Sequence, residues 1–168
     1  ASLARIRRGL TLQQPTELPA LEIVDDDLWM ITKSSSSSSR AQIHRLDGST
    51  DSWMTWSGSS TEEIPAGTGV SIQKCSDIVY FAFEGEVWDG EGGIARYDTI
   101  NDEWLDPFEA EWRDWGPDPD EEGLMWSSVT SLACDDENIL YAGLDEGDYG
   151  IQRYDTEEDE WLESLDPW

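Results

Sequence analysis

The segment YDTINDEWL occupies residues 97–105, and the segment YDTEEDEWL occupies residues 154–162. The two segments are identical at seven of nine positions and lie 57 residues apart. A weaker third copy, LDGSTDSWM, occupies residues 46–54. In all three copies a Trp follows the first residue of the segment by seven positions. Self-similarity at a regular spacing is the sequence signature of a protein built from repeated structural units.

Each copy closes a longer unit that contains four candidate strands, recognised as short apolar or period-2 segments. In the second unit these segments cover residues 69–74, 78–84, 93–98 and 103–108. In the third unit they cover residues 128–133, 139–144, 149–155 and 160–165. The turn at residues 98–102 is rich in Asp and Asn, whose side chains hydrogen-bond nearby backbone groups and tolerate a left-handed conformation. Four short antiparallel strands, repeated roughly every 50 residues, predict an all-β fold of β-propeller blades.

The repeats also carry a family resemblance. The order Gly92-Gly93, Tyr97-Asp98 and Trp104 resembles the kelch repeat, and residues 136–155 resemble the propeller repeat of two-component regulators. The resemblance covers roughly residues 18–168. The first repeat departs most from the pattern, because Leu46 replaces the Tyr and a serine run fills residues 34–39.

The expected domain organisation follows from the repeats. We expect a basic lead segment, extended or disordered, and then three four-stranded blades, at residues 1–17, 18–57, 66–112 and 123–168. Three blades are fewer than even the smallest closed propellers contain. Three blades alone would also leave sheet edges and blade flanks open, which is a liability for a soluble protein. We therefore expect either a partial propeller within a larger parent protein or a propeller assembled from several chains, with a homo-oligomer as one form.

The charge balance of the 168-residue chain is strongly acidic. Asp and Glu number 38 against 10 Lys and Arg, for a formal net charge of -28. This balance argues against a nucleic acid as partner, because binding to a polyanion draws on clustered Lys and Arg. No run of 18 apolar residues is present, so membrane insertion is not expected. The 10 Trp and 5 Tyr residues argue against disorder and predict a core packed with aromatic side chains.

An acidic, lysine-poor composition fits two locations. One is the cell surface or the extracellular medium, and the other is a high-salt cytoplasm, where salt screens the self-repulsion of a compact acidic chain. Both locations stay open from the sequence.

The two cysteines and the one histidine give little support to a catalytic site. Cys75 and Cys134 each end the first strand of their repeat, and we expect two small buried thiols near the propeller axis. A disulfide would need the two Cα atoms to lie within about 7 Å, which is tight for neighbouring blades. His44 is the only histidine, so a Ser-His-Asp triad would have to use it, and a packed or surface role is favoured. We assign no catalytic or cofactor-binding residue.

The residues that recur by repeat have structural and functional interpretations. Arg45, Arg96 and Arg153 could ring the propeller and bind an anionic ligand, but pairing with Asp on the same or next blade is favoured. The recurring aromatics are expected to pack between blades; they are Tyr97, Tyr154, Trp53, Trp104 and Trp161.

Residues outside the repeat register are the candidates for ligand contact. Trp56, Trp88, Trp112, Trp115, Trp126 and Trp168 share no register. Trp112 and Trp115 lie in the long connection at residues 109–123, where aromatics favour partner or carbohydrate contact unless the connection folds over a blade edge and buries them. Most of the acidic clusters are expected to be solvated surface. Calcium is the one cofactor that they could hold, with oxygen ligands either from Asp118, Asp120 and Glu121 or from the loop that contains Asp145 and Asp148.

The function that the sequence favours is non-catalytic. We expect a structural or protein- and ligand-binding module in a larger or oligomeric extracellular assembly. One alternative is a propeller hydrolase or lyase with a carboxylate-lined channel. Another is a calcium-dependent, lectin-like binder that uses loop Trp residues.

Overall fold

A computed structural model of the chain describes residues 17–33, 41–58, 61–85, 92–109, 123–124, 128–145 and 150–165. These residues form three groups of four strands. The first group is β1 Glu17–Val24, β2 Asp27–Lys33, β3 Gln42–Asp47 and β4 Ser52–Ser57. The second is β5 Thr68–Cys75, β6 Ile78–Glu84, β7 Gly93–Asp98 and β8 Glu103–Phe108. The third is β9 Val129–Cys134, β10 Ile139–Leu144, β11 Ile151–Asp155 and β12 Glu160–Leu165.

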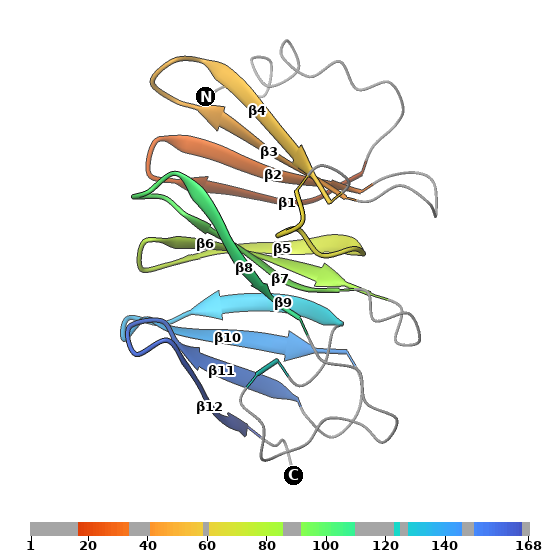
Figure 1. The fold of residues 1–168 in the computed structure, drawn as a ribbon, viewed down its shortest axis with the longest axis vertical. Coiled ribbons are helices and arrows are strands. Elements are labelled where there is room, and N and C mark those ends of the chain that lie inside the picture. The colour runs from red at the N-terminus through yellow and green to blue at the C-terminus, as the bar shows by residue number, and fades with distance from the viewer. Residues whose placement is uncertain are drawn as a thin grey trace.

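Each group forms its own antiparallel sheet, in which every strand pairs with its neighbour in the chain. The three sheets stack in chain order, each twisted relative to the next (Figure 1). We call them blade 1, blade 2 and blade 3. The predicted all-β fold of four-stranded repeats is confirmed, and the arrangement is that of a partial propeller. The strands expected in the second and third repeats agree with the observed ones to within two residues.

The acidic residues of the repeat build its turns. After β7, the Asp98 carboxylate accepts hydrogen bonds from the backbone N–H groups of Ile100 and Asn101, at 2.7 and 2.9 Å. The bond from Asn101 is the main cause that lowers the pKa of Asp98. Asp102 then adopts a left-handed φ of 56°, a conformation that Asp tolerates.

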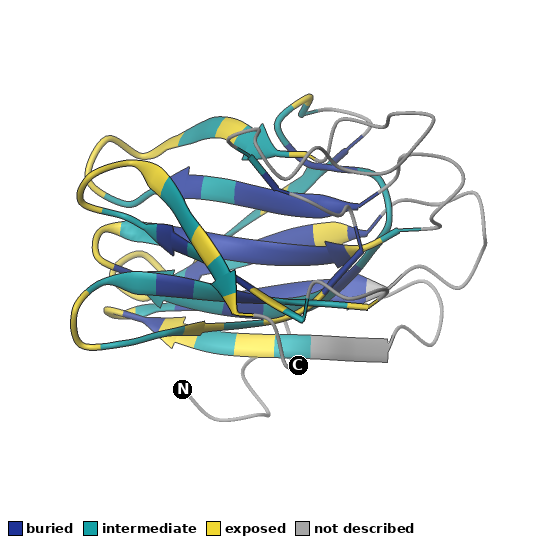
Figure 2. Cartoon of the chain, turned by 90° about the horizontal axis from the view of Figure 1, so that it is seen from below, coloured by how far each residue is buried: buried dark blue, intermediate teal, exposed yellow. Residues whose placement is uncertain are grey.

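The same turn recurs after β3 and β11. Asp47 accepts from the backbone of Ser49 and Thr50, and Asp155 accepts from the backbone of residues 157 and 158. These turns are exposed at one end of the strands, whereas the strand interiors are buried (Figure 2).

The core lies between the blades. One buried cluster joins blade 1 to blade 2, and a second joins blade 2 to blade 3. The first strands of the blades come together, since β5 contacts both β1 and β9. Blade 2 thus uses both faces of its sheet for packing, one against blade 1 and the other against blade 3.

The expectation of two separate thiols is wrong. Cys75 and Cys134 form a disulfide, with their Cα atoms 5.6 Å apart. This distance lies within the usual range for a disulfide. It arises because β5 and β9 lie against each other, so equivalent positions on adjacent blades are closer than the sequence alone indicated. The disulfide ties blade 2 to blade 3.

Candidate functional site

The candidate site is the set of contacts by which one blade holds the next. Side chains alternate between the two faces of a strand, so each blade has a front face, toward the preceding blade, and a rear face, toward the following one. Strand register defines four equivalent rear positions per blade. They are Trp29, Ile43, Arg45 and Trp56 in blade 1, Tyr80, Ile94, Arg96 and Phe108 in blade 2, and Tyr141, Ile151, Arg153 and Leu165 in blade 3.

Three equivalent positions on the front side of each blade come from the quoted repeat segment. They are Leu46, Asp51 and Trp53 in blade 1, Tyr97, Asp102 and Trp104 in blade 2, and Tyr154, Asp159 and Trp161 in blade 3. The contact between a rear face and the next front face is called a joint below.

Aromatic rings fill the joint between blades 1 and 2. The ring centroids of Trp29 and Tyr97 lie 5.0 Å apart, and those of Trp56 and Trp104 lie 5.5 Å apart in an edge-to-face arrangement. Phe81, on the front face of blade 2, packs on both Trp29 and Trp104. Such pairs contribute about 0.5–1.5 kcal/mol each beyond the area that they bury.

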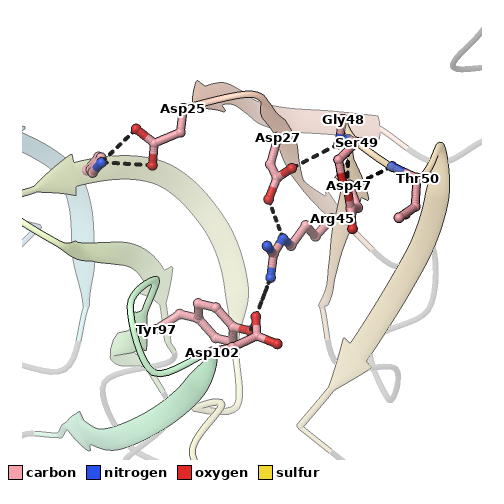
Figure 3. Close-up of polar contacts among 10 residues, drawn as sticks. Asp25, Asp27, Arg45, Asp47, Gly48, Ser49, Thr50, Tyr97 and Asp102 are labelled. Atoms are coloured by element: carbon pink, nitrogen blue, oxygen red, sulfur yellow. Dashed lines mark hydrogen bonds and ion pairs between the residues drawn. The ribbon is translucent and has the colours of Figure 1, made fainter.

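Arg45 bridges the same joint at its edge (Figure 3). Its Nε donates to Asp27 of blade 1 at 2.5 Å, and its Nη1 donates to Asp102 of blade 2 at 2.6 Å. The Tyr97 hydroxyl donates to the same Asp102 oxygen at 2.5 Å. The guanidinium carbon lies 5.3 Å from the ring centroid of Trp29, within range of a cation–π contact. One arginine therefore joins two carboxylates and an aromatic ring from two blades.

The contacts among Arg45, Asp102 and Tyr97 shift the pKa of each group. The Tyr97 hydroxyl, followed by Arg45, lowers the pKa of Asp102 below its ordinary value. Burial works against the charge of Arg45, but the hydrogen bonds that Arg45 donates to Asp102 and Asp27 outweigh burial and raise the pKa of Arg45. Burial, followed by the hydrogen bond to Asp102, raises the pKa of Tyr97. Arg45 and Asp102 are therefore charged and Tyr97 is neutral at neutral pH, so an ion pair links the two blades.

The joint between blades 2 and 3 repeats this plan. Nη1 of Arg96 lies 3.7 Å from Asp159, and its guanidinium carbon lies 4.0 Å from the centroid of Phe108. The Tyr154 hydroxyl donates to Asp159. Phe108 packs edge to face on Tyr154 and Trp161, at 4.7 and 4.9 Å. The recurring Arg, Tyr and Trp are thus brought together with an Asp at both joints.

The third arginine keeps one contact of the second, because Arg96 also donates from Nε to a backbone oxygen of its own blade, that of Asp106, at 2.8 Å. Arg153 donates from Nε and Nη2 to the backbone oxygen of Glu163, at 3.1 and 2.9 Å. Among the described residues it forms no ion pair. It lies on the rear face of blade 3, beyond which the described residues form no further blade.

The front face of blade 1 has its own small cluster. Trp53 packs against Leu28, Met30 and Leu46, which are buried. His44 is buried beside them, and its two ring nitrogens lie 3.1 Å from the Thr32 hydroxyl and 2.9 Å from the Thr55 hydroxyl. Burial lowers the pKa of His44. The histidine is therefore packed in the sheet between two threonines.

Most of the residues considered for calcium or carbohydrate lie outside the described part of the chain: Asp118, Asp120, Glu121, Asp148, Trp112 and Trp115. Asp145 is described; it is exposed, and its backbone N–H donates to the Ser128 carbonyl at 3.1 Å. Within the described residues no group of three or more His, Cys, Asp or Glu side chains could hold a metal ion. No described helix is long and apolar enough to span a membrane.

Sequence reasoning missed several residues of the joints. Trp56 was grouped with aromatics outside the repeat register, but it lies in β4 and stacks on Trp29 at 5.9 Å. The acceptors Asp102 and Asp159 were also missed. Their signal was present, because each follows the Tyr of its repeat by five positions, and Asp51 follows Leu46 by the same spacing.

Comparison with known proteins supports the fold. No protein-family model and no curated protein matches the chain. Among solved structures, it is similar to the extracellular domain of the one-component system BT4673 from B. thetaiotaomicron, with a TM-score of 0.57 and 16% identity over 94% of this chain. It is also similar to PorZ, a bacterial surface component of the type-IX secretion system of Porphyromonas gingivalis, with a TM-score of 0.59 and 13% identity over 90%. A third similar structure is the polysaccharide lyase Uly1, with a TM-score of 0.52 and 10% identity over 99%.

The chain spans 17%, 20% and 47% of these three proteins, respectively. At such low identity the likeness shows the fold alone. The neighbours include the extracellular domain of a one-component system and a surface component of a secretion system, and all three are similar to this chain in fold. The finer resemblance to kelch repeats stays a prediction from the sequence.

Proposed function

We propose that this chain is a non-catalytic propeller segment that serves as a structural and binding module in an extracellular assembly. The observation that carries the proposal is the position of the recurring polar residues between the blades. Arg45 with Asp102, and Arg96 with Asp159, lie between consecutive blades. Because the polar residues repeated along the chain hold sheets together, they are not available to converge on a reaction centre. This pattern favours a scaffold.

The disulfide supports an extracellular location. Disulfides form and persist in oxidising compartments and are rare in a reducing cytosol. The Cys75–Cys134 bond therefore favours the cell surface or the medium over a high-salt cytoplasm. The extracellular domain and the surface component among the structural neighbours point the same way.

A polysaccharide lyase is the second candidate, because the alignment with Uly1 covers 99% of this chain. A turnover assay separates the two functions. The purified, disulfide-bonded chain is incubated with a panel of uronic-acid polysaccharides. New carbon–carbon double bonds are followed by ultraviolet absorbance, and new reducing ends are followed chemically. A binding module produces neither signal. Turnover that is proportional to protein concentration would overturn the proposal and favour the enzyme.

The same polysaccharides, cast into native gels, test carbohydrate as the ligand. A chain that is retarded without turnover would act as a carbohydrate-binding module. Repeating the gels with calcium and with a chelator tests whether the contact depends on a metal, because a calcium-dependent binder is retarded only when calcium is present. Calcium bound by the native state alone would also raise the stability of the chain. A chain that is neither retarded nor active would point to protein partners instead.

A further inference from the structure

We propose that the rear face of blade 3 is a docking surface for a further blade whose front face carries aromatic rings, a carboxylate and a cation, as the front face of blade 2 does. The inference rests on the proposed role as a binding module, and it names the surface and the chemistry of the partner. The central residues of the surface are Tyr141, Ile151 and Arg153.

Apolar side chains on the rear face of blade 3 are exposed where their equivalents are buried. Ile43 and Ile94 are 0% exposed beneath the following blade, whereas Ile151, at the same register position, is 41% exposed. Leu165, which pairs with Ile151, is 43% exposed. Exposed apolar side chains gathered on one sheet face mark an interaction surface. This rear face therefore has the side chains of a joint without a described blade against it.

The aromatic position of this face shows the same contrast. Trp29 and Tyr80 are each 1% exposed between blades. Tyr141, at the equivalent place in β10, is half-buried, and its hydroxyl donates to Asp135 of its own blade at 2.8 Å. A ring held in this way can receive an aromatic ring from a partner, as Trp29 receives Tyr97 with 5.0 Å between the ring centroids.

The arginine of this face favours a partner with a carboxylate. Arg45 reaches Asp102 on the next blade at 2.6 Å, and Arg96 lies 3.7 Å from Asp159. Arg153 has the same place on blade 3, and it forms no ion pair with a described residue. In a chain with a net charge of -28, an arginine placed in this way favours a partner that brings a carboxylate to the same point.

The turn between β9 and β10 offers the opposite charge. At the first joint, Lys74 on the front face of blade 2 donates to Asp25, which lies in the turn between β1 and β2, at 2.9 Å. The corresponding turn of blade 3 carries Asp136 and Glu137, which are both exposed. A partner with a cation at the Lys74 position would meet this acidic turn while its carboxylate meets Arg153. Opposite charges at two places on one face determine how the partner is oriented.

The described front faces show what the partner carries. Blades 2 and 3 present a Tyr, an Asp and a Trp, and both of these faces are covered by the preceding blade. Blade 1 has Leu46 in place of the Tyr, so it lacks the hydroxyl that donates to the Asp at both joints. None of the three described sheets therefore leaves a matching front face open. The partner is a further blade with a Tyr, an Asp five positions later and a Trp seven positions later.

An added blade of known front face tests the proposal. The full, disulfide-bonded chain is extended after its last residue by a flexible linker and a second copy of residues 61–108. This copy supplies the cation, the carboxylate and the two aromatic rings: Lys74, Asp102, Tyr97 and Trp104. Cys75→Val in the copy removes an unpaired thiol, because Val24 occupies the same position in blade 1.

Tyrosine nitration, mapped by mass spectrometry, measures whether the added blade covers the face. Tyr141 should react in the parent chain, because it is half-buried, and it should become protected in the extended chain. Tyr154, which is 3% exposed at the second joint, is the internal reference and should stay protected in both proteins.

Truncation of Ile151 gives a second measurement. In the extended chain Ile151→Ala should lower the urea midpoint by about 0.5–1 M, because it leaves a cavity, whereas in the parent chain it should change the midpoint little. Ile94→Ala is the matched control, because Ile94 is buried at the second joint, and it should lower the midpoint in both proteins. If Ile94→Ala does not fold, the pair Ile94→Val and Ile151→Val makes the same comparison.

A charge exchange tests the contact of Arg153. In the extended chain Arg153→Glu would face the Asp102 carboxylate of the added blade and should lower the urea midpoint more than it does in the parent chain. Asp102→Arg in the added blade should then recover most of that loss, because the two charges are again opposite. A loss that the exchange does not recover would show that Arg153 does not meet this carboxylate.

Two results would overturn the proposal. Equal nitration of Tyr141 in both proteins, together with equal effects of Ile151→Ala, would show that the face does not dock a blade. Protection of Tyr141 that grows with the concentration of the parent chain would show that a second copy covers the face, so the choice of partner would be wrong. Neither result affects the turnover assay, which decides the proposed non-catalytic function on its own.

Discussion

At the scale of single residues, stability depends on a few polar groups placed between sheets. Asp102 accepts hydrogen bonds from Tyr97 and from Arg45, which belong to different blades. His44 is buried with its ring nitrogens against two threonine hydroxyls. Each group makes the free energy of unfolding depend on pH in its own window.

We expect Asp102→Asn to lower the free energy of unfolding by about 1 kcal/mol at pH 7, a modest value because the carboxylate is largely exposed. The pKa of Asp102 is lowered in the folded state by Tyr97 and Arg45. Its contribution is therefore present above the unfolded value near 4 and is lost as pH falls through the folded value. Urea unfolding of both proteins between pH 7 and 3 measures the difference. The exposed Asp106→Asn is the control, and a constant difference down to the lowest pH would contradict the ion-pair interpretation.

His44 predicts a second window. Burial lowers its pKa in the folded state, so the unfolded chain takes up the proton first as pH falls through about 6.5. The free energy of unfolding should then fall from pH 7 toward the lower folded pKa. His44→Gln should flatten that dependence, because the chain has no other histidine. An unchanged slope in urea unfolding at pH 5 to 7 would show that His44 is accessible to solvent in the folded state.

At the scale of elements, strands follow directly from the sequence, whereas the joints do not. The period-2 segments and the Asp-rich turns predict β5 to β12 to within two residues, because alternation and turn chemistry are local. Which face meets which neighbour depends on the packing distance between sheets. For that reason Trp56 was assigned no register, and the Cys75–Cys134 bond was not expected. The repeated Asp spacing was visible in the sequence, but its partner on the preceding blade was not.

The aromatic joint should dominate the stability of the first two blades. Trp104 packs on Trp56, Phe81 and Tyr97, and its Nε1 is buried without a hydrogen-bond partner in the described structure. Trp104→Ala should lower the free energy of unfolding by about 3 kcal/mol. Trp104→Phe should lose less than half of that, because it keeps a ring and removes the unsatisfied donor. Thermal and urea unfolding measure both losses. If Trp104→Phe lowers the free energy of unfolding as much as Trp104→Ala does, ring packing is not what holds this joint.

At the scale of the whole molecule, three sheets stack in chain order (Figure 1), and one disulfide links the second sheet to the third. The disulfide closes a loop across 59 residues between blades 2 and 3. Replacing both cysteines by serine should lower the free energy of unfolding by roughly 2–4 kcal/mol, chiefly by freeing the unfolded chain. Urea unfolding of the double variant against the oxidised parent measures this loss. A double variant that is as stable as the parent would mean that the bond is absent or strained in solution.

The central claim is that the blades stack in chain order with their first strands side by side. Disulfide mapping tests it most directly, because only that arrangement brings Cys75 and Cys134 within 5.6 Å. The chain, exported to an oxidising compartment, is alkylated without reductant, digested and analysed by mass spectrometry. The account predicts a peptide pair cross-linked through Cys75 and Cys134 of one chain. Two alkylated cysteines, or a bond between different chains, would contradict it.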